Sequence, residues 1–273
     1  MTSTPVLLTT TQRTSTTALL VEAAARRGHR TTELAGPDTV ERLAGRPVHW
    51  YGGPFAARRV AGPLDLALLE PTDDWLPRLP EEFTGRRIEL TTLSQARAAR
   101  RPQFVKPPSD KSFPPAVFSD GSRLPRAEGG LGPDTPVLVC EPVTFVVEYR
   151  LFVLDGEPAT GSRYARYGRL DTAPLPGDPH EAQVRDFARR LLAGVAATLP
   201  SAVVVDVGLL QDPDTGREQW AVVEANMPWF AHAYAADPDR VLDVVLRSAG
   251  PRAALAPADR RFAADGGRPG GQG

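Results

Sequence analysis

Short apolar runs alternate with helix-period segments along the first third of the chain. The run at residues 5–10 is followed by a segment in which Thr14 or Ser15 caps a helix that reaches about Arg27 and stops at Gly28. A second apolar run covers residues 64–71. This strand–helix order predicts a small α/β lobe over residues 1–92. No G-x-G-x-x-G motif follows the first run, which argues against dinucleotide binding there.

From residue 93 the pattern changes. Strand signals mixed with prolines occupy residues 102–118, a glycine-rich stretch covers 119–135, and an apolar strand returns at 136–143. Residues 181–199 predict a core-facing helix, and residues 238–248 predict a final one. The apolar stripe of the first of these helices consists of Val184, Phe187, Ala188, Leu191, Leu192, Val195 and Leu199. The segment 251–273 ends in a glycine-rich sequence and is predicted to be disordered.

Residues 144–165 predict a β-hairpin that carries charge on one face. Asp155-Gly156 is a strong two-residue turn signal, and counting outward from it sets Glu148 opposite Arg163. Alternation then places Glu148, Arg150 and Arg163 on one face, while the apolar residues of 145–153 form a core face. The charged face is either a solvated surface with a cross-strand ion pair or part of a site.

Residues 201–229 predict a second hairpin, with turn residues at 212–217. A five-residue loop would set Asp206 opposite Glu224, with Asn226 two residues further on the same face. Two opposed carboxylates flanked by valines are destabilising unless a cation lies between them. Two carboxylates and an amide oxygen suit Mg²⁺. The alternative is that Asp206 and Glu224 only mark the ends of strands.

The amino-acid composition limits the classes of protein to which the chain can belong. The 273 residues carry a formal net charge of -1, so no global field attracts nucleic acid or anionic lipid. A single cysteine, Cys140, excludes a disulfide framework and a cysteine-based zinc site. No apolar run approaches the roughly 20 residues of a membrane span, and the N-terminus lacks the pattern of a signal peptide. We therefore expect a cytoplasmic protein without nucleic-acid or membrane partners.

Lysine is rare in this arginine-rich chain, and Lys106 and Lys111 are its only lysines. A magnesium site, two arginines on one sheet face and two lysines are the parts that phosphoryl transfer needs. Lysines hold nucleotide phosphates, the metal bridges the phosphate oxygens, and arginine stabilises the transferring group.

The order of these motifs resembles the ATP-grasp superfamily of carboxylate–amine ligases. The matching segments are "FVKP", "EYRLFV", "VVDVGLL" and "VVEANMPW". "SDKSF", "GSRY" and the stretch from Pro228 to Val245 are similar to the clade named for one Arg and two Lys. The resemblance covers about residues 100–250. It implies an α/β (α+β) ATP-grasp fold, with two lobes that grip ATP behind a small N-terminal lobe. The implied parts are 1–92, 93–250 (a nucleotide lid at 93–143 and a catalytic lobe at 144–250) and the tail 251–273.

Carried over by position, the resemblance assigns a role to each candidate residue. ATP would contact Lys106 and Lys111, and adenine would meet the backbone near Val139, Cys140 and Glu141. Mg²⁺ would be bound by Asp206, Glu224 and Asn226. Arg150 and Arg163 would orient a substrate carboxylate and stabilise an acylphosphate, and Glu148 would fix Arg163 or touch substrate.

The implied activity is an ATP- and Mg²⁺-dependent ligase that forms an amide or peptide bond through an acylphosphate and releases ADP and phosphate. Its substrates would be a small-molecule carboxylate and an amine, such as an amino acid or peptide. An ATP-dependent small-molecule kinase and a non-catalytic nucleotide-binding protein are the alternatives. The chain departs from many such ligases in having prolines near Lys111 and Met-Pro-Trp after Asn226. The substrates and the oligomeric state stay open.

Overall fold

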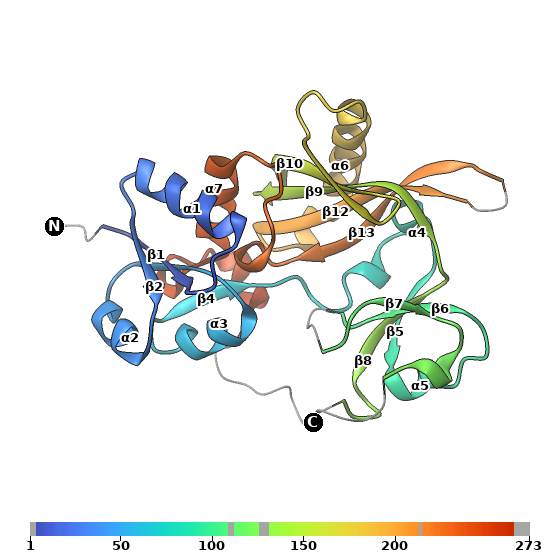
Figure 1. The fold of residues 1–273 in the computed structure, drawn as a ribbon, viewed down its shortest axis with the longest axis horizontal. Coiled ribbons are helices and arrows are strands. Elements are labelled where there is room, and N and C mark those ends of the chain that lie inside the picture. The colour runs from blue at the N-terminus through green and yellow to red at the C-terminus, as the bar shows by residue number, and fades with distance from the viewer. Residues whose placement is uncertain (1–3, 109–111, 126–130, 213–214, 265–273) are drawn as a thin grey trace.

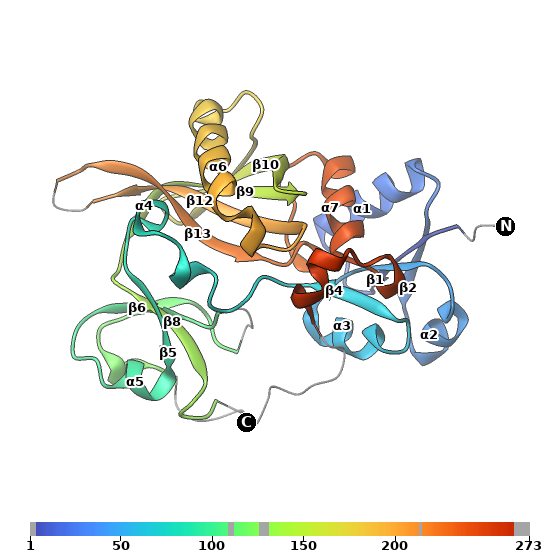
Figure 2. The ribbon, with the colours of Figure 1, turned by 180° about the vertical axis from the view of Figure 1, so that it is seen from behind.

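The computed structural model of the protein describes residues 4–108, 112–125, 131–212 and 215–264. An N-terminal α/β unit, a four-stranded sheet and a five-stranded sheet make up its main parts. Figure 1 shows the N-terminal unit in blue and the four-stranded sheet in teal and green, at opposite ends of the five-stranded sheet; the reverse view in Figure 2 agrees. Mixed helices and sheets confirm the predicted α/β (α+β) class.

The N-terminal unit is built on a parallel sheet with strand order β2-β1-β3. Its helix α1 begins as predicted, because the side chain of Thr14 accepts a hydrogen bond from the Thr17 amide at 3.0 Å. The chain leaves the helix through Gly28, whose φ of 74° suits glycine. The elements are β1 (Val6–Thr10), α1 (Ser15–Arg26), β2 (Arg30–Leu34), α2 (Pro37–Leu43), β3 (Val48–Tyr51) and α3 (Pro54–Ala61).

The C-terminal segment folds back onto this unit. Strand β4 (Leu66–Leu69) pairs antiparallel with β14 (Ala249–Pro251) and with β15 (Ala263–Ala264). The prediction of a disordered tail from residue 251 is therefore wrong for residues 251–264, which the apolar edge of β4 orders. Residues 265–273 lie outside the described residues.

The four-stranded sheet has the antiparallel order β5-β8-β6-β7. Its first strand, β5 (Ile88–Thr92), pairs along its whole length with β8 (Pro136–Cys140). The predicted boundary at residue 92 is wrong because it would cut this sheet. The other elements are β6 (Gln103–Lys106), β7 (Ala116–Phe118) and α5 (Leu93–Arg97), and α4 (Glu81–Thr84) precedes the sheet.

The five-stranded sheet has the order β11-β10-β9-β12-β13. Its back face, with Tyr149 and Val207, packs against α6 (Glu181–Val195), whose predicted apolar stripe is buried. Part of its front face, including Phe152 and Val204, packs against α1 and α7 (Pro238–Ser248). The rest of the front face carries the polar residues considered below. The strands are β9 (Thr144–Leu154), β10 (Glu157–Arg166), β11 (Arg169–Pro174), β12 (Ala202–Gln211) and β13 (Glu218–Asn226).

The Met-Pro-Trp segment joins the end of β13 to the N-terminal unit. Trp229 is buried in the core formed with β1, β3 and β4, and its indole Nε1 donates to the carbonyl of Leu69 at 3.0 Å. The amide of Gly52 donates in turn to the Trp229 carbonyl at 2.9 Å. Trp229 thus fixes how the two units meet.

No helix in the described part of the chain combines the length and the apolar composition that a bilayer crossing needs.

Candidate active site between the two sheets

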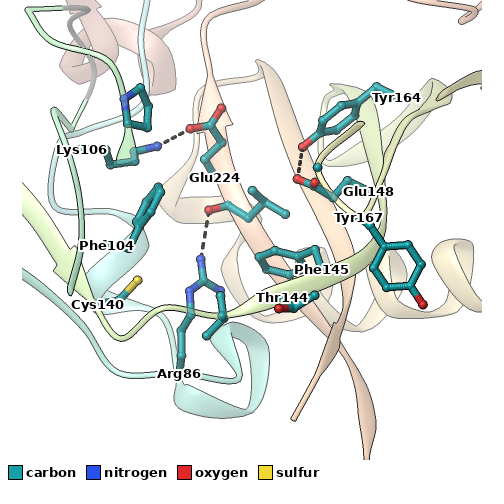
Figure 3. Close-up of a pocket in the computed structure, with 14 residues that line it drawn as sticks. Arg86, Phe104, Lys106, Cys140, Thr144, Phe145, Glu148, Tyr164, Tyr167 and Glu224 are labelled. Carbon is teal, nitrogen blue, oxygen red and sulfur yellow. Dashed lines mark hydrogen bonds and ion pairs between the residues drawn. The ribbon is translucent and has the colours of Figure 1, made fainter. Parts of the chain in front are cut away.

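A cavity of about 480 Å³ lies between the four-stranded sheet and the front face of the five-stranded sheet (Figure 3). Residues of β6 and β8 line it on the side of the four-stranded sheet, and residues of β9, β10 and β13 line it on the side of the five-stranded sheet. Its walls combine aromatic and apolar surface with a few charged groups. The residues that line it are Arg86, Phe104, Lys106, Pro115, Cys140, Val143, Thr144, Phe145, Glu148, Tyr164, Tyr167, Gly168, Val223 and Glu224.

The second hairpin places its carboxylates as predicted. Asp206 on β12 lies opposite Glu224 on β13. The route differs from the prediction, because Gln211 pairs with Glu218 and the loop is one residue longer than expected. A bulge at Val223 restores the opposition.

Two cations neutralise this pair of carboxylates. Arg150 on β9 binds Asp206 through both oxygens, with Nε–Oδ1 at 2.9 Å and Nη2–Oδ2 at 2.7 Å. Lys106 on β6 donates to Glu224, so this ion pair joins the two sheets across the cavity. Asn226 donates its amide nitrogen to Glu224 at 2.7 Å. The predicted need for positive charge is therefore met by side chains.

The pKa values follow from these contacts. Burial alone would raise the pKa of Glu224, but the charge and hydrogen bond of Lys106, together with the amide of Asn226, lower it to about 2. Burial would lower the pKa of Arg150, yet the charge of Asp206 outweighs it and the pKa is raised. Glu224 and Arg150 therefore stay charged across the working pH range.

Glu148 belongs to the same face and lines the cavity. Its carboxylate accepts a hydrogen bond from the Tyr164 hydroxyl at 2.6 Å. Burial is the main cause that raises the pKa of Glu148 above its ordinary value, and the neighbouring Asp206 and Glu224 add to it. The rings of Tyr164 and Tyr234 stack, and the guanidinium of Arg150 lies 5.6 and 5.2 Å from their centroids.

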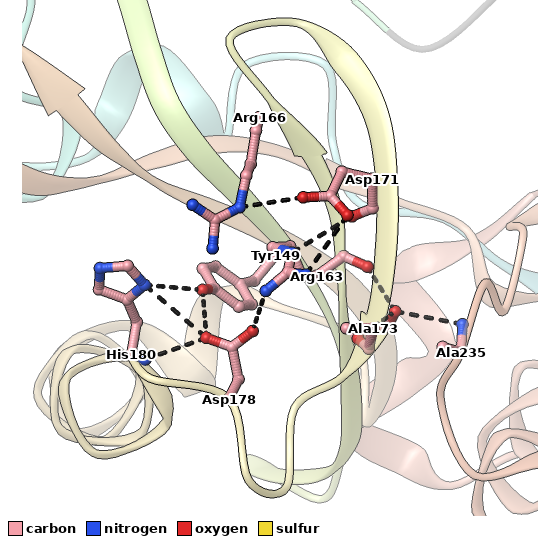
Figure 4. Close-up of polar contacts among 9 residues, drawn as sticks. Tyr149, Arg163, Arg166, Asp171, Ala173, Asp178, His180 and Ala235 are labelled. Carbon is pink, nitrogen blue, oxygen red and sulfur yellow. Dashed lines mark hydrogen bonds and ion pairs between the residues drawn. The ribbon is translucent and has the colours of Figure 1, made fainter.

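The predicted position of Arg163 is wrong. The register of the first hairpin shifts after Pro158, so that Arg163 lies opposite Tyr149 on the back face. There its guanidinium binds Asp178 at 2.5 Å (Figure 4). Asp178 also accepts the Tyr149 hydroxyl at 2.6 Å and the His180 amide at 2.9 Å. Arg163 therefore does not share a face with Arg150 and Glu148.

Only some of the residues predicted to contact the nucleotide line the cavity. Lys106 and Cys140 line the cavity, whereas Val139 and Glu141 are not among its lining residues. Val139 pairs with both Glu89 and Val105 in the middle of its sheet. Lys111 lies outside the described residues.

Sequence reasoning missed Arg86 and Tyr164. Tyr164 follows the predicted Arg163 directly, and the shift after Pro158 turns it toward Glu148 instead of Arg163. Arg86 lies before residue 100, where the motifs that resemble the ATP-grasp superfamily begin. An arginine beside the short strand β5 gave no signal of its own, because Arg is the common cation of this chain.

The donor set of the front face suits Mg²⁺. Asp206, Glu224 and Asn226 offer two carboxylates and an amide oxygen, which are hard ligands. The amide of Asn226 uses its nitrogen toward Glu224, and the carbonyl oxygen takes no part in that bond. Within the described residues, no group of three or more His, Cys, Asp or Glu side chains is placed to hold a metal, so water or phosphate oxygens would complete the shell.

Comparisons with known proteins bear on this site. The D-alanine–D-alanine ligase from Bacillus anthracis is 14% identical, with a TM-score of 0.53 over 90% of this chain and 97% of that one. Its complex with ATP is 14% identical, with a TM-score of 0.53 over 91% and 97%. A RimK domain ATP-grasp protein from Sphaerobacter thermophilus is 18% identical, with a TM-score of 0.45 over 89% and 99%. At these identities the likeness to the D-alanine–D-alanine ligase shows the fold alone.

No curated protein matches the chain. A model of the ATP-grasp domain, family 2 of the clade named for one Arg and two Lys, matches residues 83–244, or 162 of the 273 residues. The match includes the cavity-lining strands of both sheets. Because it spans more than half of the chain, the protein belongs to this ATP-grasp family.

Proposed function

We propose that the protein is an ATP- and Mg²⁺-dependent ligase that joins a carboxylate to an amine through an acylphosphate and releases ADP and phosphate. Membership of the ATP-grasp family supports ATP use. The observation that carries the proposal is the opposed pair Asp206 and Glu224, bound by Arg150 and Lys106. Glu224 and Lys106 of this group line the cavity between the two sheets.

Lys106 would bind a phosphate of the nucleotide, for which it would exchange its present partner Glu224. Such an exchange is feasible because the pair sits at the cavity wall and joins separate sheets. Asp206, Glu224 and Asn226 would hold Mg²⁺. When bound, the metal would neutralise phosphate charge and orient the γ-phosphoryl group.

Arg150 has a positioning role in this proposal. Its side chain is 10% exposed and binds both oxygens of Asp206, so it holds that carboxylate on the front face. Removing one member of such a pair leaves the other buried without compensation. The stacked rings of Tyr164 and Tyr234 hold the guanidinium in place.

The ligation would proceed in two steps, a phosphoryl transfer followed by an acyl transfer. A carboxylate oxygen of the substrate attacks the γ-phosphorus of ATP, and the bond to ADP breaks. The amine then attacks the acyl carbon of the acylphosphate, and phosphate leaves. Glu148 lines the cavity and has a raised pKa, so it would accept the proton that the amine loses. An amino acid or a peptide would supply the carboxylate and the amine, as the D-alanine–D-alanine ligase fold suggests.

Product analysis tests this function. Purified protein with ATP, Mg²⁺ and a pool of amino acids should release ADP and phosphate only when an acyl donor and an amine are both present. Mass spectrometry should then detect the ligated product. Release of AMP would contradict the mechanism. A phosphorylated product formed without any amine would identify a kinase, and nucleotide binding without turnover would identify a binding protein.

A further inference from the structure

Arg86 is a buried cation whose guanidinium points at the backbone instead of at a carboxylate. Its exposed fraction is 6%, and it follows α4 at the edge of the cavity. Burial lowers its pKa. Its Nε is buried and finds no hydrogen-bond partner among the described residues. Buried arginines are uncommon unless they are paired with a carboxylate, because burying an unpaired charge costs free energy. This cost points to a role for the arginine at the cavity.

The carbonyls that Arg86 binds lie on the edge strand β13. Nη1 donates to the Val222 carbonyl at 3.0 Å and Nη2 to the Val223 carbonyl at 3.4 Å. Nη1 also donates to the carbonyl of Thr84 at 2.8 Å. Figure 3 shows Arg86 below Glu224 with one of these bonds drawn. Successive carbonyls of a regular strand point to opposite edges, so a single guanidinium that reaches both marks an interruption of the strand.

That interruption is the bulge at Val223. Val207 pairs with Val222, but the next residue back, Asp206, pairs with Glu224, which leaves Val223 as the extra residue. Without the bulge, Glu224 would lie opposite Val205. Val205 belongs to the core beneath α6, and a shift of one residue moves a side chain to the other face of a sheet. The bulge is therefore what brings Glu224 to the cavity beside Asp206.

We propose that Arg86 is a positioning residue that holds this bulge and thereby aims Glu224 into the cavity. The inference rests on the proposed magnesium and nucleotide site, and it assigns the site's geometry to a residue that touches neither carboxylate. Arg86 supplies the donors for carbonyls that the bulge turns out of the sheet. These bonds also anchor the short segment between α4 and β5 to β13, and Gln219 adds a further bond there by donating to the Gly85 carbonyl at 3.3 Å.

A double-mutant cycle on Mg²⁺–ATP binding tests the inference. Titration calorimetry would compare the wild type, Arg86→Met, Glu224→Gln and the double variant. Arg86→Met should weaken binding about tenfold, because hydrogen bonds from a charged donor are lost. The double variant should bind no more weakly than Glu224→Gln, because Arg86 acts through Glu224. Arg87→Met is the matched control: this neighbouring cation is exposed, pairs with Glu89, and should bind like wild type.

A second measurement separates a positioning role from general support of the fold. Amide hydrogen exchange of Arg86→Met should speed up in residues 218–226 and stay unchanged in the β9–β10 hairpin. Arg86→Lys keeps the charge but cannot span two carbonyls, so it should show the same changes to a smaller degree. It also replaces Arg86→Met in the cycle should that variant fail to fold.

The outcomes distinguish the possible errors. Additive losses in the cycle would overturn the inference and indicate that Arg86 contacts the nucleotide directly. Wild-type affinity in a folded Arg86 variant would overturn it as well. If the wild type itself bound no Mg²⁺–ATP, the proposed function would fail instead.

Discussion

The two faces of the five-stranded sheet each bury an arginine–aspartate pair. On the front face Arg150 binds Asp206, and on the back face Arg163 binds Asp178. Both aspartates are almost fully buried, with exposed side-chain fractions of 1% and 0%. The chemistry of the two pairs is the same, and their surroundings are different.

All partners of the pair on the back face come from the five-stranded sheet and the loop before α6. Asp178 accepts from Tyr149 and from the His180 amide as well as from Arg163, so its oxygens are satisfied. These contacts tie the loop before α6 to strands β9 and β10. The front pair instead stands beside a second carboxylate, Glu224, whose cation Lys106 comes from the other sheet.

The difference shows what distinguishes a structural ion pair from a site. A carboxylate with a complete set of donors holds two elements together and has no bond left to give. Glu224 lines the cavity, and its cation comes from the other sheet, so in the proposed site it is the carboxylate that would exchange its partner when a nucleotide and a metal arrive. Burial of an arginine–aspartate pair alone would not have separated the two.

The largest expected effect is on the back face. Asp178→Asn should lower the free energy of unfolding by about 3 kcal/mol, because it removes the buried carboxylate of Arg163 and leaves only the more exposed Asp171 as its charged partner. Urea unfolding would measure this loss. Asp186→Asn, which removes an exposed carboxylate on α6, should change stability by less than about 1 kcal/mol. If Asp178→Asn abolished Mg²⁺–ATP binding in the folded protein, the back face would belong to the site.

A smaller effect is expected where the two sheets meet. Lys106→Met should weaken ATP binding about tenfold, since one charged contact to phosphate is lost. Displacement of a fluorescent nucleotide would measure it, with Arg101→Met as an exposed control on the same unit. Equal affinities for Lys106→Met and wild type would remove Lys106 from the nucleotide site.

The smallest effect concerns the pH dependence of stability. Glu224 has a pKa lowered from 4.5 to about 2, so its ion pair stabilises the fold above pH 4.5 and loses that contribution as the pH falls toward 2. The stability difference between wild type and Glu224→Gln should therefore shrink over this window. Urea unfolding at pH 7, 4 and 3 would show it, and a constant difference would mean that Lys106 does not hold Glu224.

Both hairpins were predicted from the sequence, but the residues that share a face were predicted correctly only for the second hairpin. The Asp155-Gly156 turn pairs Leu154 with Glu157 as expected. The register then shifts after Pro158, which has no amide to donate to the ladder, and this shift moves Arg163 to the back face. In the second hairpin a longer loop and a bulge compensate each other, so the opposition of Asp206 and Glu224 was predicted correctly.

Long-range contacts account for what could not be predicted. The ordering of residues 251–264 depends on β4, almost 200 residues earlier in the chain. Arg86 reaches β13 across 136 positions, and no local pattern marks it. Periodicity and turn chemistry report on neighbours along the chain, whereas these contacts depend on how the units pack.

Titration of the wild type and Glu224→Gln with ATP, each with and without Mg²⁺, tests the central claim that the front face is a metal–nucleotide site. Mg²⁺ should strengthen ATP binding by the wild type, and this gain should be lost in Glu224→Gln while the folded structure is kept. A Glu224→Gln variant that retains the full gain from Mg²⁺ would contradict the claim.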